Sequence, residues 1–284
     1  MNREIDAPDL VLESRPLSEG MAIRFGATLL ANLLRGGLSF ISGILIARGL
    51  GALDYGDLNF LLGSFAAFSQ LLDMGTSSAF YTFISQRRRT GKFFLLYISW
   101  LIFQFLATVI VVGLLIPADL LERIWVGHDR QIVLLAFAAS FFMTQLWGMM
   151  SQLGEATRKT VVVQAAAVTQ SMIHLGLVVA AVYWKWLTVH TVLWLLTGEY
   201  AILAGLFGRR LLRENLAEYS NESDEGAGTV KQFAVYCKPL VSYVWVGFLY
   251  AFADRWLLQE FGGAEQQGFF AIGQQFANIS LLAT

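Results

Sequence analysis

From residue 22 onward the chain repeats one pattern, a run of about twenty apolar residues followed by a short polar break. At a rise of about 1.5 Å per residue, a helix of that length crosses the hydrocarbon core of a bilayer. The pattern therefore predicts an all-α integral membrane protein, a polytopic bundle of about eight transmembrane helices. The predicted spans are residues 22–47, 58–83, 93–116, 131–152, 161–184, 187–208, 233–258 and 266–284.

The longest polar break divides these spans into two sets. Residues 209–232 are acidic and flexible in composition, which is typical of a linker. The last apolar run has not ended at Thr284, so we expect a C-terminally truncated chain with an incomplete second bundle. The predicted organisation is a cytoplasmic tail at 1–21, a first six-helix bundle at 22–208, a cytoplasmic linker at 209–232 and the start of a second bundle at 233–284.

A short internal repeat supports this division. The pattern Gly-Ala-x-x-x-Gly occurs at Gly51–Gly56, between the first two spans, and at Gly263–Gly268, between the last two. Six spans separate the copies, and six is an even number. The two bundles are therefore expected to be parallel repeats related by an axis along the membrane normal.

Charge and composition define the orientation and exclude several functions. Arg and Lys concentrate in the breaks after spans 2, 4 and 6, which places the N-terminus in the cytoplasm by the positive-inside rule. The net charge of −1 gives no footprint for nucleic acid. The sequence has one cysteine, three separated histidines and no P-loop, nucleophile-elbow or zinc-protease motif. We therefore expect no cofactor, no metal site and no enzymatic activity.

Two arginines in the first span are the strongest functional candidates. An ionisable group in hydrocarbon costs at least about 2.5 kcal/mol, so it marks a functional site by default. Helical spacing brings Arg24 and Arg35 into one sector of roughly 80° together with Asn32, Ser39 and Ser42. This stripe predicts either a watery cavity with an anionic partner or a structural pairing with a buried carboxylate.

Other charged groups fall within later spans. Asp73 and Glu199 are the carboxylates that could neutralise Arg35, or that could bind a coupling cation or proton. Lys238 begins span 7 and is either a second cation of a shared cavity or a side chain that snorkels to the interface. His174 could shuttle protons or serve as a hydrogen-bonded structural residue.

Several short motifs together resemble the polysaccharide-export flippases of the multidrug/oligosaccharidyl-lipid/polysaccharide exporter superfamily. The layout of the whole chain is also similar, although members of that family have more spans than the eight predicted here. The motifs are Ala47-Arg48-Gly49-Leu50-Gly51-Ala52-Leu53-Asp54-Tyr55-Gly56, Asp73-Met74-Gly75, Lys238-Pro239-Leu240, Asp254-Arg255-Trp256-Leu257, and Gly262-Gly263 through Gly268-Phe269-Phe270-Ala271.

The resemblance implies a transporter of the bacterial cytoplasmic (inner) membrane. It would flip undecaprenyl-pyrophosphate-linked oligosaccharide to the outer leaflet by alternating access, for surface polysaccharides such as lipopolysaccharide and exopolysaccharide. Arg24, Arg35 and Lys238 would then bind the pyrophosphate in a cationic cavity, and Asp73 and Glu199 would serve ion coupling or charge pairing. The expected partners are the lipid-linked oligosaccharide, membrane lipid and a polysaccharide polymerase or export complex.

Two alternatives remain open from the sequence. A cation-coupled multidrug antiporter of the same superfamily would depend on acidic groups, so Asp73→Asn would then impair transport more than Arg35→Ala. A non-transporting membrane scaffold, or a truncated relic, would tolerate both substitutions.

Overall fold

The computed structural model describes residues 17–86, 91–218 and 226–281, and every regular element within these ranges is helical. The prediction of an all-α polytopic fold is therefore confirmed. The elements are α1 (Leu17–Asp73), α2 (Thr76–Gln86), α3 (Gly91–Ile110), η1 (Val111–Leu115), α4 (Ala118–Ile124), α5 (Arg130–Phe141), η2 (Phe142–Leu146), α6 (Trp147–Ala156), α7 (Thr160–Tyr183), α8 (Val189–Glu218), α9 (Gly226–Cys237), η3 (Lys238–Leu240), α10 (Val241–Leu257), η4 (Leu258–Gly262) and α11 (Gly263–Leu281).

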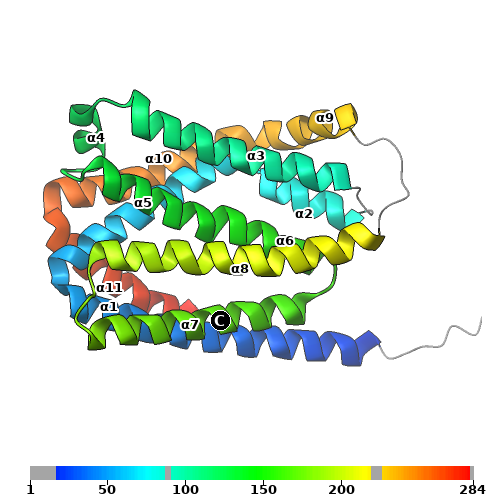
Figure 1. Ribbon diagram of the computed structural model, residues 1–284, viewed down its shortest axis with the longest axis horizontal. Coiled ribbons are helices and arrows are strands. Elements are labelled where there is room, and N and C mark those ends of the chain that lie inside the picture. Colours follow the sequence, from blue (N-terminus) through cyan, green and yellow to red (C-terminus); the bar gives the residue numbers. More distant parts are fainter. Residues whose placement is uncertain (1–16, 87–90, 219–225, 282–284) are drawn as a thin grey trace, which may run out of the picture.

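Both copies of the glycine repeat reverse the chain direction. Gly51 has φ 81° and ψ 173°, and Gly263 has φ 78° and ψ 170°. Glycine reaches this region without the steric penalty that a Cβ would bring. Figure 1 shows α1 running to one end of the molecule and returning, and α10 and α11 doing the same. The first glycine of the repeat thus has the same backbone conformation in both places.

This reversal accounts for the number of membrane crossings. The described residues contain six apolar helical stretches long enough to span a membrane, and two of these, Phe25–Asp73 and Gly228–Ala277, are 49 and 50 residues long. One crossing needs only about 20 residues. Since each long stretch turns back at its glycine, six stretches fit the eight crossings predicted from the apolar runs.

Some predicted boundaries differ from the observed ones. The predicted span 58–83 is interrupted, because α1 ends at Asp73 and α2 begins at Thr76. Met74 and Gly75 between them have φ values of 45° and 83°, which a helix does not accommodate. Helices α8 and α9 both extend into the predicted linker, of which 219–225 lie outside the described residues, as do residues 1–16 of the predicted tail.

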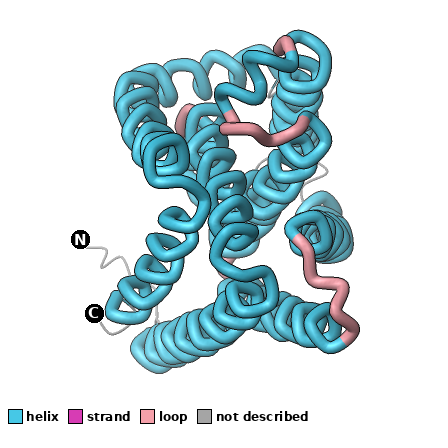
Figure 2. The backbone as a smooth tube through the Cα atoms, turned by 90° about the vertical axis from the view of Figure 1, so that its left-hand side faces the viewer, coloured by secondary structure: helices cyan, strands magenta, loops and turns pink. Residues whose placement is uncertain are grey.

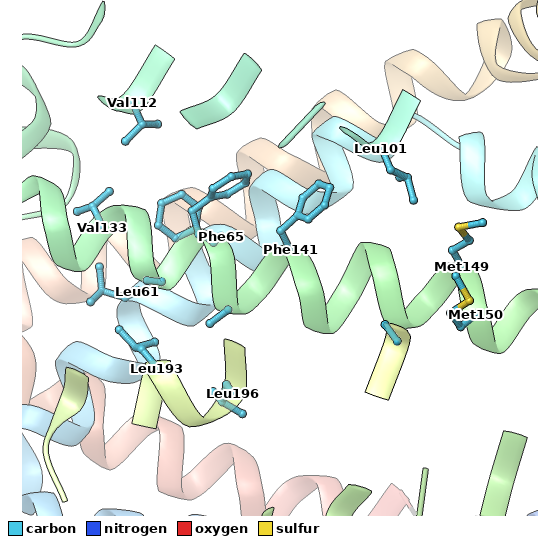
Figure 3. Close-up of a cluster of buried hydrophobic side chains, with 14 of the residues drawn as sticks. Leu61, Phe65, Leu101, Val112, Val133, Phe141, Met149, Met150, Leu193 and Leu196 are labelled. Carbon is cyan, nitrogen blue, oxygen red and sulfur yellow. The ribbon is translucent and has the colours of Figure 1, made fainter. Parts of the chain in front are cut away.

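Aromatic side chains make up much of the hydrophobic core. Phe65 stacks on Trp125 with ring centroids 5.3 Å apart and also contacts Phe137 at 5.6 Å. Figure 3 shows Phe65 of α1 among buried side chains that include Leu61, Val133 and Phe141. Viewed from one end, the described backbone consists of helices joined by short loops (Figure 2). This packing surrounds the polar residues described below.

The two halves of the repeat meet in a close seam between α1 and α11. A Cβ at Gly56 would overlap the carbonyl oxygen of Ala264, and a Cβ at Gly268 would overlap that of Ala52. The backbones can approach this closely only because both positions are glycine. We call this contact between residues 51–57 and 263–268 the glycine seam.

Candidate functional site

Arg35 lies on the first half of α1 with its side chain exposed. It forms no ion pair or hydrogen bond with another described residue. Tyr200 on α8 is within electrostatic range of both Arg35 and Glu199. The predicted pairing of Arg35 with a carboxylate is therefore not formed here, although the guanidinium and Glu199 approach the same tyrosine. The backbone of Arg24 belongs to α1, but its side chain lies outside the described residues.

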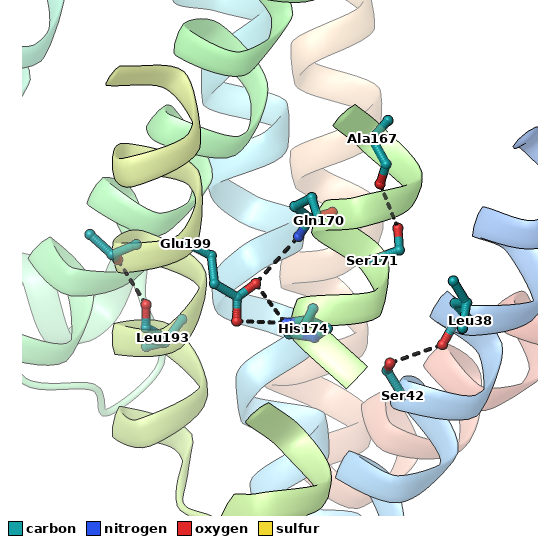
Figure 4. Close-up of polar contacts among 9 residues, drawn as sticks. Leu38, Ser42, Ala167, Gln170, Ser171, His174, Leu193 and Glu199 are labelled. Atoms are coloured by element: carbon teal, nitrogen blue, oxygen red, sulfur yellow. Dashed lines mark hydrogen bonds and ion pairs between the residues drawn. The ribbon is translucent and has the colours of Figure 1, made fainter. Parts of the chain in front are cut away.

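Glu199 is the buried carboxylate of the bundle, with 7% of its surface exposed. His174 Nδ1 lies 3.1 Å and 3.0 Å from its two oxygens, and Gln170 Nε2 donates to Oε2 at 3.3 Å. Figure 4 shows Gln170 and His174 on α7 directed at Glu199 on α8, with Ser42 of α1 on the far side of α7. The structure thus places His174 in a hydrogen-bonded network, which sequence reasoning had offered as one of its two roles.

Asp73 has a local structural task that sequence reasoning missed. Its Oδ1 accepts from Ser77 N at 2.8 Å and from Thr76 Oγ1 at 3.1 Å. Its Oδ2 accepts from Ser77 Oγ at 2.9 Å and from Gly75 N at 3.2 Å. A carboxylate offers about four lone-pair sites, so these bonds use its capacity to start α2. Arg35 forms none of them.

A polar groove lies beside Asp73, between α1–α2 and η2–α6. Its cavity volume is about 320 Å³. The residues that line it are Ala66, Ser69, Gln70, Asp73, Ser77, Thr144, Gln145, Gly148, Met149 and Gln152. Polar side chains at this density inside two apolar spans need a polar partner, because unpaired amides and hydroxyls cost free energy in hydrocarbon.

Some of these polar atoms are paired with one another and some are not. Gln145 Nε2 donates to the carbonyl of Ser69 at 2.8 Å, and Thr144 Oγ1 donates to Ser69 Oγ at 3.1 Å. Gln152 Oε1 is buried without a hydrogen-bond partner. A Cβ at Gly247 of α10 would lie 3.5 Å from Gln70 Oε1, so α10 passes close to the groove. The groove therefore has an unsatisfied buried acceptor on its α6 side and lies close to α10 on its α1 side.

A π-helical turn brings the span 4 residues into the groove. Thr144 and Gln145 lie within η2, Phe142–Leu146, which interrupts an otherwise α-helical span. Such π-bulges are frequent at functional sites because they rotate side chains relative to the helix on either side. Sequence reasoning missed Thr144, Gln145 and Gln152. The signal for them was the pair of glutamines, Gln145 and Gln152, in the second half of the apolar run 131–152.

Lys238 is not close to Arg35. It begins η3, where α9 gives way to α10, and its side chain is exposed. The helix that precedes it and the first half of α1 lie at opposite edges of the molecule in Figure 1. The structure therefore brings Asp73 to the polar groove and Arg35 to the neighbourhood of Glu199. Lys238 lies apart from Arg35, at the junction of α9 and α10.

Comparison with known proteins identifies the family. Residues 24–282 match the family model Polysacc_synt, described as polysaccharide biosynthesis protein. No match was found among curated proteins or among solved structures. The matched region covers nearly all of the chain and all eight predicted spans. The chain therefore belongs to the polysaccharide biosynthesis protein family, whose members are membrane proteins of transporter or flippase type.

Proposed function

We propose that this protein moves a polyprenyl-pyrophosphate-linked oligosaccharide from the inner to the outer leaflet of the bacterial cytoplasmic membrane. The observation that carries the proposal is the polar groove. Its glutamine, serine and threonine side chains both donate and accept hydrogen bonds, as sugar hydroxyls do. At about 320 Å³ it is within the range of about 300–1,000 Å³ that is usual for small-ligand pockets.

The groove suits a sugar better than a cationic drug. Asp73 is its only charged lining residue, and the four hydrogen bonds that start α2 already occupy the carboxylate. A site for cations would need an available negative charge. The remaining lining groups are neutral amides, hydroxyls and apolar surface. This argument favours an oligosaccharide head over the substrate of a multidrug antiporter.

Arg35 is the group that we assign to the pyrophosphate. It is exposed on α1 and has no ion-pair partner among the described residues, so it is available to an anion. Hydrogen bonds between a guanidinium and phosphate oxygens are bidentate and charge-assisted. Arg24 lies on the same helix face as Arg35 and would extend the same cationic stripe. Rocking of the two repeats about the glycine seam would provide alternating access.

Glu199 is the better candidate for ion coupling. Asp73 is committed to α2, whereas Glu199 shares a buried site with a second titratable group, His174. Protonation of either group would change the charge of that site, which shares Tyr200 as an electrostatic neighbour with Arg35. We therefore assign coupling to the Glu199–His174 pair rather than to Asp73.

The test is the fate of lipid-linked oligosaccharide in cells that lack the gene. We expect it to accumulate on the cytoplasmic leaflet, with loss of surface polysaccharide. Complementation with Arg35→Ala should fail although the variant inserts into the membrane, and the control Arg209→Ala, an exposed arginine in the C-terminal third of α8, should restore export. Normal surface polymer without a trapped intermediate would refute the flippase. Full export by Arg35→Ala would remove Arg35 from the site.

A further inference from the structure

A second groove, separate from the polar one, lies where α3 faces α9 and η3. Its cavity volume is about 580 Å³. Leu96, Tyr97 and Trp100 of α3 form one wall, and Phe233, Cys237 and Lys238 contribute to the other. We call it the lysine groove. No residue lines both grooves, since the polar groove is formed by Asp73 and Ser77 with η2 and α6.

The lysine groove combines an apolar interior with one positive charge. Its walls are mostly aromatic and aliphatic, with Met74, Thr76 and Cys237 as the other uncharged side chains, and Lys238 is the only charged residue in its lining. Lys238 has no carboxylate partner among the described residues. A lysine in this setting lays its methylene stem along apolar surface and presents its ammonium group at the end. The matching ligand has an apolar chain and an anionic group directly attached to it.

The position of Lys238 at the junction between α9 and α10 supports the same kind of ligand. Lys238 stands at η3, where Pro239 removes a backbone N–H and ends α9. By the positive-inside argument, this start of span 7 lies at the cytoplasmic side of the membrane. The ammonium group would therefore meet phosphates of the cytoplasmic leaflet, and the apolar walls would continue from there into the hydrocarbon.

We propose that the lysine groove binds the first isoprene units of a polyprenyl phosphate, with the phosphate on Lys238. One groove takes one chain, and a polyprenyl phosphate has its single chain attached directly to the phosphate, whereas a glycerophospholipid presents two chains through a glycerol. The inference rests on the proposed function, because the occupant is the carrier lipid of the proposed substrate. Lys238 would hold its phosphate at the cytoplasmic leaflet before the pyrophosphate reaches Arg35, since the two residues are not close to each other. The inference adds a site for the tail outside the polar groove.

The experiment uses the purified full chain in detergent and native mass spectrometry. The probes are undecaprenyl phosphate, uncharged undecaprenol and phosphatidylglycerol. We expect one undecaprenyl phosphate to be retained per protein in preference to the other two. Lys238→Gln should lower that retention about tenfold, the equivalent of roughly 1.4 kcal/mol. Lys231→Gln is the matched control, because Lys231 is an exposed lysine of α9 that does not line the groove.

A second variant tests the apolar part of the site. Ala234 lines the groove and its side chain is exposed, so Ala234→Trp should fill the space and lower retention of both undecaprenyl phosphate and undecaprenol. Wild-type retention by Lys238→Gln and Ala234→Trp, or equal retention of phosphatidylglycerol, would overturn the proposal. The probes contain no sugar and the assay needs no transport. Normal surface polysaccharide in cells that lack the gene would therefore contradict the proposed function and leave the lipid-binding result intact. Equally, failure to retain undecaprenyl phosphate would overturn this inference and leave the flippase test intact.

Discussion

Substitution of Gly56 by alanine is the most direct test of how the two repeats are joined. The new Cβ would overlap the Ala264 carbonyl, a backbone atom that can move only with α11 itself. Overpacking of this kind costs about 1–3 kcal/mol. Separation of the helices would also break the bond from Gln275 Nε2 to Tyr55 Oη, now 2.7 Å, for about 0.5–1.5 kcal/mol more. We expect a total loss of about 1.5–4.5 kcal/mol.

The measurement is the melting temperature of the purified variant in detergent, compared with Gly37→Ala. Gly37 lies on the same helix, and a Cβ there would meet nothing within 4 Å. The control should be unchanged or stabilised by up to about 1 kcal/mol, since alanine is the better helix former. Gly268→Ala should behave like Gly56→Ala, with Gly273→Ala as its open-space control. Equal melting temperatures for Gly56→Ala and Gly37→Ala would refute the close seam.

Three further predictions concern the polar contacts. Glu199→Ala leaves His174 without its partner and should lower the free energy of unfolding by about 3–5 kcal/mol. The double variant with His174→Ala should lose less than the sum of the two single losses. Full additivity would show that the two side chains are not coupled. Asp73→Ala should cost about 0.5–2 kcal/mol and Asp73→Asn less, because the amide oxygen still caps α2; equal losses would contradict a capping role. For His128, burial lowers the pKa, but the hydrogen bond and charge of Asp57, together with hydrogen bonds to the backbone of Trp125 and Val126, raise the pKa above 6.5. The stabilisation from the His128–Asp57 pair is therefore present below pH 6.5 and lost as pH rises through the folded-state pKa of His128. Across this range the melting temperature should fall with rising pH in wild type and fall less in Asp57→Asn. The same pH dependence in both proteins would exclude a stabilising His128–Asp57 pair.

Asp73 and Lys238 show where sequence reasoning about the site stopped. Both were recognisable as charges inside apolar spans, because the cost of burying a charge depends only on the residue and its place in the run. Their surroundings depend on the backbone. Asp73 caps α2 because the helical conformation is interrupted at Met74 and Gly75. Lys238 lines an apolar groove because α9 packs beside α3.

The sequence by itself determined the membrane class, the eight apolar runs and the glycine repeat, since hydrophobicity and backbone freedom are properties of each segment. It also singled out Arg35 and Glu199 as charges in need of an explanation. Only the tertiary structure decided which segments are neighbours. The polar groove is formed by residues of span 2 and residues of span 4. Thr144 and Gln145 reach it from a π-helical turn that the hydrophobic periodicity of the sequence does not predict. Contacts between distant segments depend on the packing of whole helices, and that information is not local to any one of them.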